Sequence, residues 1–227
     1  MKILKNTVSL FSCFFLIFQS FLAFGQKGVK NTPVAQIQEV TKEIDTATSV
    51  IQWKGTKKIL INDFHEGTLQ IASGSIKIIG DDQLDSGNVV IDMKTISSTD
   101  LKGEYKGKLE GHLKNSDFFD VSKYPQATFK FTKENVTPLK GKKFLIEGTM
   151  TIKERSHEWP IEISFDSDST NLKNAKKATG VLSFDRTKFG ISYNPEVSDS
   201  ILATLEKKVK EKIISNTITA KLNISFR

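Results

Sequence analysis

Cysteine is nearly absent from this 227-residue chain, which contains only Cys13. Cys13 lies in an apolar run near the N-terminus, so the rest of the chain has no thiol for a disulfide or a metal-thiolate site. Histidine is also scarce, and His65, His112 and His157 show no H-x-x-H or H-E-x-x-H spacing. We therefore expect a fold stabilised by its core alone, with no cofactor; a metal site would require folding to gather distant histidines.

The motifs of several enzyme classes are missing as well. There is no G-x-S-x-G nucleophile motif and no P-loop, and no nucleophile stands beside a base. Asp185-Arg186 is more typical of a structural ion pair or a hydrogen-bonding unit at a strand end than of a catalytic acid. We expect a non-enzymatic protein, and an enzyme that acts on a lipid or isoprenoid is the most remote alternative.

Negative charge is in the minority. The formal net charge is +7, and Lys2 and Lys5 contribute two of these charges at the N-terminus. The remaining basic residues form no patch interleaved with aromatic residues, which is the pattern of a nucleic-acid-binding surface. We therefore expect no nucleic-acid partner, whereas transient contact with a membrane surface, or a phosphate-bearing ligand, is compatible with the charge.

The N-terminus has the pattern of a secretory signal peptide. Lys2 and Lys5 precede an apolar run over residues 8–24, and Ala23-Phe24-Gly25 places small residues where a signal peptidase cleaves. A membrane anchor is the alternative, but serine and glutamine interrupt the run and no basic stop-transfer cluster follows closely. We expect residues 1–25 to be removed and the protein to be periplasmic or secreted.

The remaining sequence divides into a leader and one domain. Residues 26–47 show no period and predict a flexible leader, whereas residues 48–227 alternate apolar and polar positions between turn residues. Polar outer faces and regular turns favour an all-β fold, an eight-stranded antiparallel β-barrel. The eight strands are expected at residues 50–54, 65–79, 89–94, 127–132, 144–152, 159–165, 178–185 and 217–226.

Two connections in this barrel are expected to be structured. Gly111 and the turn residues of 115–117 break any alternation, which predicts a short helix or loop after the third strand. Apolar residues at helical spacing predict an amphipathic helix over residues 199–214, before the last strand. Its lysines favour a helix that covers a barrel end with a solvated face, and docking on a membrane or a partner is the alternative.

The interior of such a barrel is either filled by side chains or just wide enough for one slender ligand. Composition alone leaves both possibilities open. The residues assigned to the interior, and to the lining of an apolar tunnel if one exists, are Trp53, Leu69, Ile71, Ile91, Met93, Phe118, Phe119, Phe129, Phe131, Ile146, Met150, Ile161, Ile163, Phe184, Leu222 and Ile224.

The order of residues from 109 to 131 is distinctive. His112-Leu113-Lys114, Asp117-Phe118-Phe119-Asp120 and Tyr124-Pro125-x-Ala127-x-Phe129 follow one another without a gap. This run resembles the H-L-K-x-x-D-F-F-D and Y-P-x-A-x-F blocks of the YceI-like family of lipid- and polyisoprenoid-binding proteins. Further blocks that resemble the family are Trp53-Lys54-Gly55, His65-Glu66-Gly67, Gly148 to Lys153 and Phe184 to Ile191.

The resemblance covers about residues 48–227, and Met150 and the segment after Pro195 depart from the family pattern. It implies a lipocalin-like extended barrel that holds a long isoprenoid chain, of the polyprenyl phosphate or quinone type, in an apolar tunnel. The candidates for contact with the head group are His65, Lys114, Arg186 and Lys188. We therefore expect an exported carrier of an isoprenoid lipid, and the alternative is a side-chain-filled barrel that acts through its surface in the cell envelope.

Overall fold

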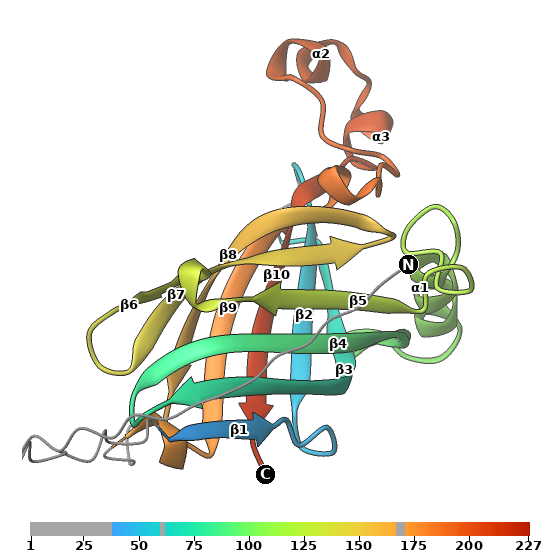
Figure 1. The fold of residues 1–227 in the computed structure, drawn as a ribbon. Helices are drawn as coiled ribbons and strands as arrows, with labels where there is room; N and C mark the ends of the chain where they lie inside the picture. Colours follow the sequence, from blue (N-terminus) through green and yellow to red (C-terminus); the bar gives the residue numbers. More distant parts are fainter. Residues whose placement is uncertain (1–37, 60–61, 167–170) are drawn as a thin grey trace, which may run out of the picture. The chain divides into compact units, whose positions relative to one another are not determined.

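The structure, a computed structural model, describes residues 38–59, 62–166 and 171–227. These residues form one ten-stranded sheet (Figure 1). Its strands are β1 (Glu39–Glu43), β2 (Val50–Lys57), β3 (Phe64–Ile79), β4 (Gln83–Ser98), β5 (Gln126–Phe131), β6 (Val136–Pro138), β7 (Lys143–Ile152), β8 (Arg155–Phe165), β9 (Lys177–Asp185) and β10 (Ile214–Ser225).

Eight of these strands close into a ring. β2 pairs with β10, the ring continues through β9, β8, β7, β5, β4 and β3, and β3 returns to β2. Every pairing is antiparallel. The predicted eight-stranded antiparallel barrel is therefore confirmed, and each predicted strand corresponds to one member of the ring. Closure leaves no free sheet edge among these eight strands, which is the usual reason for such a ring.

The long strand β3 changes its inward face halfway along. Leu69 and Ile71 are buried in its first half, and Ile76 and Ile78 in its second half. The pairing with β4 shifts between Ile71 and Ser73, so one extra residue moves the apolar positions from odd to even numbers. A bulge therefore keeps both apolar sets inside the barrel.

The strand β1 corrects the predicted leader boundary. β1 pairs with the second half of β3, and Ile44, which follows it, is 4% exposed and bridges to Phe226. Residues 39–47 therefore belong to the domain and not to a flexible leader. The sequence of β1 is almost entirely polar and does not alternate apolar with polar residues, so it gives no clear prediction of a strand. The predicted signal peptide (1–25) and the first part of the predicted leader lie outside the described residues.

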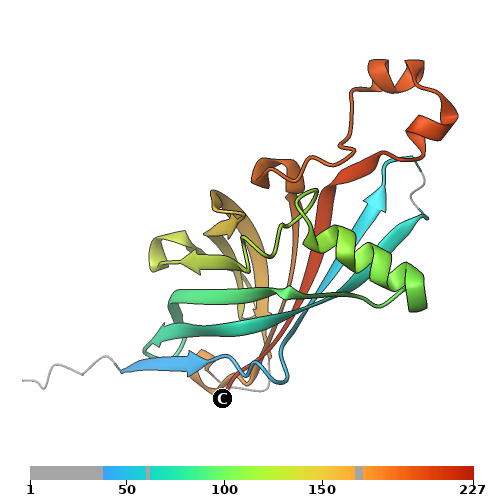
Figure 2. The same ribbon diagram turned by 90° about the vertical axis from the view of Figure 1, so that its right-hand side faces the viewer.

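The connection after β4 contains the helix α1 (Gly103–Lys114), which confirms the expected short helix. Glu110 holds it to the end of β4, because its Oε1 accepts hydrogen bonds from Ser97 Oγ (2.8 Å) and the Ser98 amide (2.9 Å). Figure 2 shows α1 beside the strands of the barrel. Within the described part of the chain, no helix has the length and hydrophobicity that crossing a membrane requires.

The predicted helix over residues 199–214 is wrong in extent and in packing. Two short helices, α2 (Asp199–Thr204) and α3 (Lys207–Lys210), replace it, and Leu205 between them is extended. Neither helix contains a buried residue, so neither covers a barrel end. Helices this short are marginal without a packed face, and the closely spaced lysines repel one another within a turn.

Three 3-10 helices complete the described elements: η1 (Lys133–Asn135), η2 (Leu172–Asn174) and η3 (Arg186–Phe189). The β7–β8 hairpin turns at Lys153 and Glu154, whose φ angles are 51° and 61°. This is a two-residue turn of the kind that matches the twist of a hairpin.

Candidate functional site

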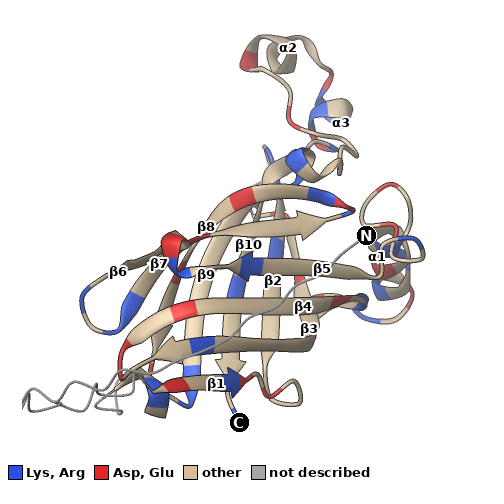
Figure 3. Cartoon of the chain, viewed as in Figure 1, with Lys and Arg blue, Asp and Glu red and all other residues tan. Residues whose placement is uncertain are grey.

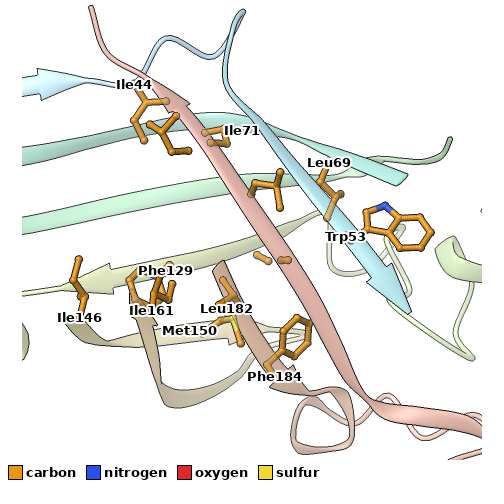
Figure 4. Packing of buried hydrophobic residues seen from close by; sticks show 14 of the residues in the cluster. Ile44, Trp53, Leu69, Ile71, Phe129, Ile146, Met150, Ile161, Leu182 and Phe184 are labelled. Carbon is orange, nitrogen blue, oxygen red and sulfur yellow. The ribbon is translucent and has the colours of Figure 1, made fainter. Parts of the chain in front are cut away.

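The barrel encloses a cavity of about 560 Å³. Every strand of the ring contributes inward side chains to its wall, and Figure 4 shows several of them pointing to the interior from opposite strands. All sixteen residues that the sequence assigns to a tunnel lining lie in this wall. The interior is therefore not filled by the protein's own side chains; contact of these residues with a ligand stays a prediction.

One end of the cavity is lined by apolar groups. Ile44, Leu84 and Phe226 line it there, next to Phe165. The rings of Phe165 and Phe226 stack with centroids 6.0 Å apart and an interplanar angle of 14°. This end offers hydrocarbon contacts and is suited to the terminus of an apolar tail.

The opposite end of the cavity carries polar groups. It lies where β2 ends and β3 and β10 begin, since Thr56 pairs with Phe64 and Lys57 pairs with Ile214. We call this end the mouth. The polar residues that line it are Thr56, Lys57, Asp63, His65, His112, Arg186, Tyr193, Asn194, Glu211 and Lys212. The cavity thus combines an apolar body with one polar end.

His65 is held in the wall of the mouth by Asp100. The ring Nδ1 lies 2.8 Å from Asp100 Oδ2, while Asp100 Oδ1 accepts hydrogen bonds from Ser98 Oγ (2.8 Å) and the Glu66 amide (3.1 Å). Burial alone would raise the pKa of Asp100, but these hydrogen bonds outweigh it and hold the pKa below its ordinary value. An ionised Asp100 therefore fixes the orientation of the His65 ring.

Arg186 lines the mouth but is occupied by the backbone. It is 1% exposed, and its guanidinium donates to the carbonyl oxygens of Ser215 (3.0 Å), Ile191 (2.8 Å), Asn194 (3.4 Å) and Ile214 (3.2 Å). Burial lowers its pKa, although the charges of Asp185 and Glu196 partly counter this. Arg186 thus ties the segment after η3 to the start of β10 and shapes the wall of the mouth.

Asp185 takes no part in the hydrogen bonds that the Arg186 guanidinium donates to backbone carbonyl oxygens. Its Oδ1 accepts hydrogen bonds from the amide (2.8 Å) and the hydroxyl (2.6 Å) of Thr187, the second residue of η3. The sequence predicts that Asp185-Arg186 is either a structural ion pair or a hydrogen-bonding unit at a strand end. The observed geometry is that of the hydrogen-bonding unit.

The other two head-group candidates lie away from the cavity wall. Lys188 is exposed, and its carbonyl oxygen lies 3.0 Å from His157 Nε2. Lys114 ends α1, and its carbonyl accepts a hydrogen bond from the Val121 amide (3.0 Å). The structure therefore brings His65 and Arg186 to the mouth and leaves Lys114 and Lys188 outside its lining.

Sequence reasoning missed several residues of the mouth. His112 and Tyr193 meet edge to face with centroids 4.5 Å apart, and Phe118 packs against both rings. His112 lies in the distinctive run of residues 109–131, and this position could have identified it as a candidate residue of the mouth. Tyr193 and Lys212 come from a segment without strand alternation, so no pattern placed them at the mouth.

No three His, Cys, Asp or Glu side chains within residues 38–59, 62–166 and 171–227 are gathered as a metal site would require. Besides the carboxylates of Asp63 and Glu211, the mouth offers lysine, imidazole, amide and hydroxyl groups. Such groups can donate hydrogen bonds to the polar end of a bound molecule.

The chain was compared with protein families and curated proteins. A family model described as YceI-like domain matches residues 43–226. A UPF0312 protein of Staphylococcus epidermidis is 29% identical over 101 residues, which cover 43% of this chain and 53% of that protein. A UPF0312 protein of Staphylococcus aureus is 30% identical over 88 residues, which cover 37% and 47%. The chain spans about half the length of the curated relatives it matches.

A solved structure shares the fold of this chain. BcnA of Burkholderia cenocepacia aligns with a TM-score of 0.56 at 18% identity, over 80% of this chain and 98% of BcnA. A structure described as a polyisoprenoid binding domain from Saccharophagus degradans aligns with a TM-score of 0.49 at 13% identity, over 84% of this chain and 99% of that domain. The similarity to BcnA shows a common fold.

Proposed function

The chain belongs to the YceI-like domain family, and from this premise we propose that it is a non-enzymatic carrier of a long-chain isoprenoid lipid. The tail lies in the barrel cavity, and a head group of the polyprenyl phosphate or quinone type lies at the mouth. The observation that carries the proposal is the polarity of the cavity, which is apolar along its length and polar at one end.

The volume of the cavity suits a tail of moderate length. An apolar cavity of 150 Å³ accommodates benzene, so a cavity of about 560 Å³ has room for about 22 carbon atoms, or roughly four isoprene units. A longer isoprenoid would extend its remaining units through the mouth. The side-chain-filled alternative predicts no such space, and the cavity argues against it.

The free energy of tail burial supports a long ligand over a short one. Each buried methylene contributes about 0.8 kcal/mol, so ten methylene equivalents contribute roughly 8 kcal/mol. Association costs about 4–15 kcal/mol in lost freedom of motion. Short apolar molecules would therefore bind weakly, and a tail that fills the cavity would bind well.

Export is part of the proposal. The N-terminal pattern predicts a signal peptide over residues 1–25, and removal of this segment leaves a chain without cysteine. A carrier outside the cytoplasm would shield the tail of an isoprenoid from water between membranes. N-terminal sequencing of the protein recovered from its native host tests this part.

The central experiment identifies the bound molecule. The protein is purified from its native host without detergent and extracted with organic solvent, and the extract is measured by mass spectrometry. We expect an isoprenoid in near-stoichiometric amount. An empty barrel, or an extract that contains only the common membrane phospholipids, would overturn the proposal.

Two variants of one strand provide the control. Ala220→Phe adds a ring inside the cavity, where Ala220 lines the wall at the middle of β10, and should reduce the amount of extracted lipid. Lys221→Phe adds the same ring on the exposed face of the same strand and should leave it unchanged. Equal lipid content in the two variants would mean that the lipid is not held in the cavity.

A further inference from the structure

The mouth is bordered by apolar side chains that face solvent. Seven large apolar side chains are exposed within the described residues, and four of them stand on two segments at the mouth: Ile59 (41% exposed), Tyr193 (37%), Ile201 (51%) and Val209 (46%). Single exposed apolar residues are ordinary, but a group of them beside a lipid-sized cavity is not. We call these four residues and the lysines of α3 the rim surface.

The two segments are joined to each other and to the barrel. The Lys58 amide donates to the Ile213 carbonyl (3.0 Å), and Lys58 Nζ lies 3.0 Å from Glu196 Oε2. Glu196 Oε1 accepts further hydrogen bonds from Ser215 Oγ (2.8 Å) and the Asn216 amide (3.1 Å). The base of the rim surface is therefore fixed at the start of β10.

The part beyond this base has no partner within the described chain. α2 and α3 contain no buried residue, and Figure 1 shows both helices beyond the strand ends. Tyr193 and Lys212, which flank the two helices in the sequence, both line the cavity. Both ends of the segment that carries α2 and α3 are therefore attached at the mouth, and a surface that contacts these helices would lie close to this end of the cavity.

The charge of α3 indicates the kind of surface that fits. Lys207, Lys208 and Lys210 are its cationic residues, and the ribbon of Figure 3 is coloured blue at lysine positions of this helix. Glu211 offsets part of this charge, since its Oε1 lies 3.9 Å from Lys207 Nζ. Two short helices that together expose apolar side chains, Ile201 on α2 and Val209 on α3, beside the lysines of α3 are suited to the interface of a bilayer that contains anionic lipids.

We propose that the rim surface docks the mouth of the cavity on a lipid bilayer. Ile59, Ile201 and Val209 enter the interfacial region, and the lysines of α3 contact anionic head groups. A tail could then pass from the bilayer into the cavity without exposure to water. This inference rests on the proposed function, because docking serves a carrier whose cargo resides in membranes.

Vesicle binding tests the inference. The protein is isolated after export, each variant is compared in the same processed form, and co-sedimentation with phosphatidylglycerol vesicles and phosphatidylcholine vesicles is measured at low and high salt. The double variant Ile201→Asp/Val209→Asp should lower partitioning about tenfold for each side chain removed from the interface. Replacing the three lysines of α3 by glutamine should lower binding to phosphatidylglycerol vesicles about fivefold per lysine at low salt, with little change on phosphatidylcholine.

Leu139→Asp is the matched control. Leu139 is similarly exposed, at 42%, but lies between β6 and β7, away from the mouth. We expect this variant to bind vesicles like the unaltered protein. Neither Ile201 nor Val209 lines the cavity, so the double variant should keep its unfolding free energy and its affinity for a prenyl alcohol added in solution.

Two results would overturn the inference. One is vesicle binding that the double variant leaves unchanged; the other is a protein that binds neither kind of vesicle, which would favour a protein partner for the rim surface. In both cases the mass of the extracted lipid still reports on the carrier proposal, so the two proposals fail separately.

Discussion

Trp53 and Gly67 face each other across the β2–β3 pairing, and the indole occupies the space that a side chain at Gly67 would need. A Cβ atom at Gly67 would lie 2.6 Å from Trp53 Cζ2 and would also overlap the Ser97 carbonyl oxygen. Trp53 Nε1 donates a hydrogen bond to the neighbouring Thr68 carbonyl (3.3 Å). The motifs Trp53-Lys54-Gly55 on β2 and His65-Glu66-Gly67 on β3 are therefore parts of one packing arrangement in the barrel wall.

We predict that Gly67→Ala destabilises the barrel. The added methyl group must displace the indole and a backbone carbonyl, and overpacking of this kind costs typically about 1–3 kcal/mol. Urea denaturation followed by circular dichroism measures the loss. Gly107→Ala in α1 is the control, because no atom lies within 4 Å of a Cβ there, and alanine should stabilise the helix by roughly 0.5–1 kcal/mol. Equal stability of the two variants would contradict the packing described.

We predict that affinity depends on tail length up to a limit. Each added methylene should tighten binding about fourfold, which corresponds to about 0.8 kcal/mol, until the tail contains about 20 carbons. Beyond this length the added units leave the mouth, and affinity should level off. A series of prenyl alcohols of increasing length, measured by displacement of a fluorescent fatty acid, gives the dissociation constants.

The variant Ala220→Phe should shift this limit. A phenyl ring occupies about the space of six carbons, so the plateau should begin at a tail shorter by about that amount. Lys221→Phe, on the outer face of β10, should keep the original plateau. Dissociation constants that do not vary with tail length would contradict binding inside the cavity.

The sequence predicts the barrel because a period of two persists through eight segments. Ile218, Ala220, Leu222, Ile224 and Phe226 all line the cavity, as strict alternation requires. The segments that escaped prediction lack this constraint. β1 carries few apolar residues, and the apolar stripe of residues 199–214 implied a packed face that the barrel does not provide. Whether the interior is open depends on how side chains from all eight strands meet, which no single strand determines.

We predict that Arg186 is required for stability rather than for head-group contact. Arg186→Lys cannot supply the four hydrogen bonds to backbone carbonyls, because an ammonium group has three donors and a different geometry. Buried carbonyl groups left without donors should cost about 3 kcal/mol in unfolding free energy. Denaturation of the lipid-free protein measures this loss. Arg155→Lys, at an exposed position at the start of β8, should change stability by less than about 0.5 kcal/mol. A fully stable Arg186→Lys protein would contradict this role.

We predict that the barrel loses stability in acid through the carboxylates around the mouth. Burial alone would raise the pKa values of Asp100, Glu110 and Glu196, but hydrogen bonds to the ionised forms outweigh it and place all three below their ordinary values of 3.8, 4.5 and 4.5. When the folded-state pKa is lowered, the unfolded chain binds more protons as the pH falls. The stabilisation is therefore complete above the ordinary pKa and disappears as the pH falls through the folded-state value.

Glu196→Gln isolates one of these contributions. Glutamine keeps an oxygen for the Asn216 amide but loses the charge that pairs with Lys58, so the unfolding free energy at pH 7 should fall. Below the lowered folded-state pKa of Glu196 the unaltered protein is itself protonated at this position, so the difference between the two proteins should shrink as the pH falls through that value. Urea denaturation at a series of pH values from 7 downward measures both curves. Glu158→Gln, which removes the same charge from an exposed position on β8, should give a curve parallel to that of the unaltered protein. If the gap for Glu196→Gln is constant across the series, the ionised carboxylate at the base of the rim surface does not stabilise the fold.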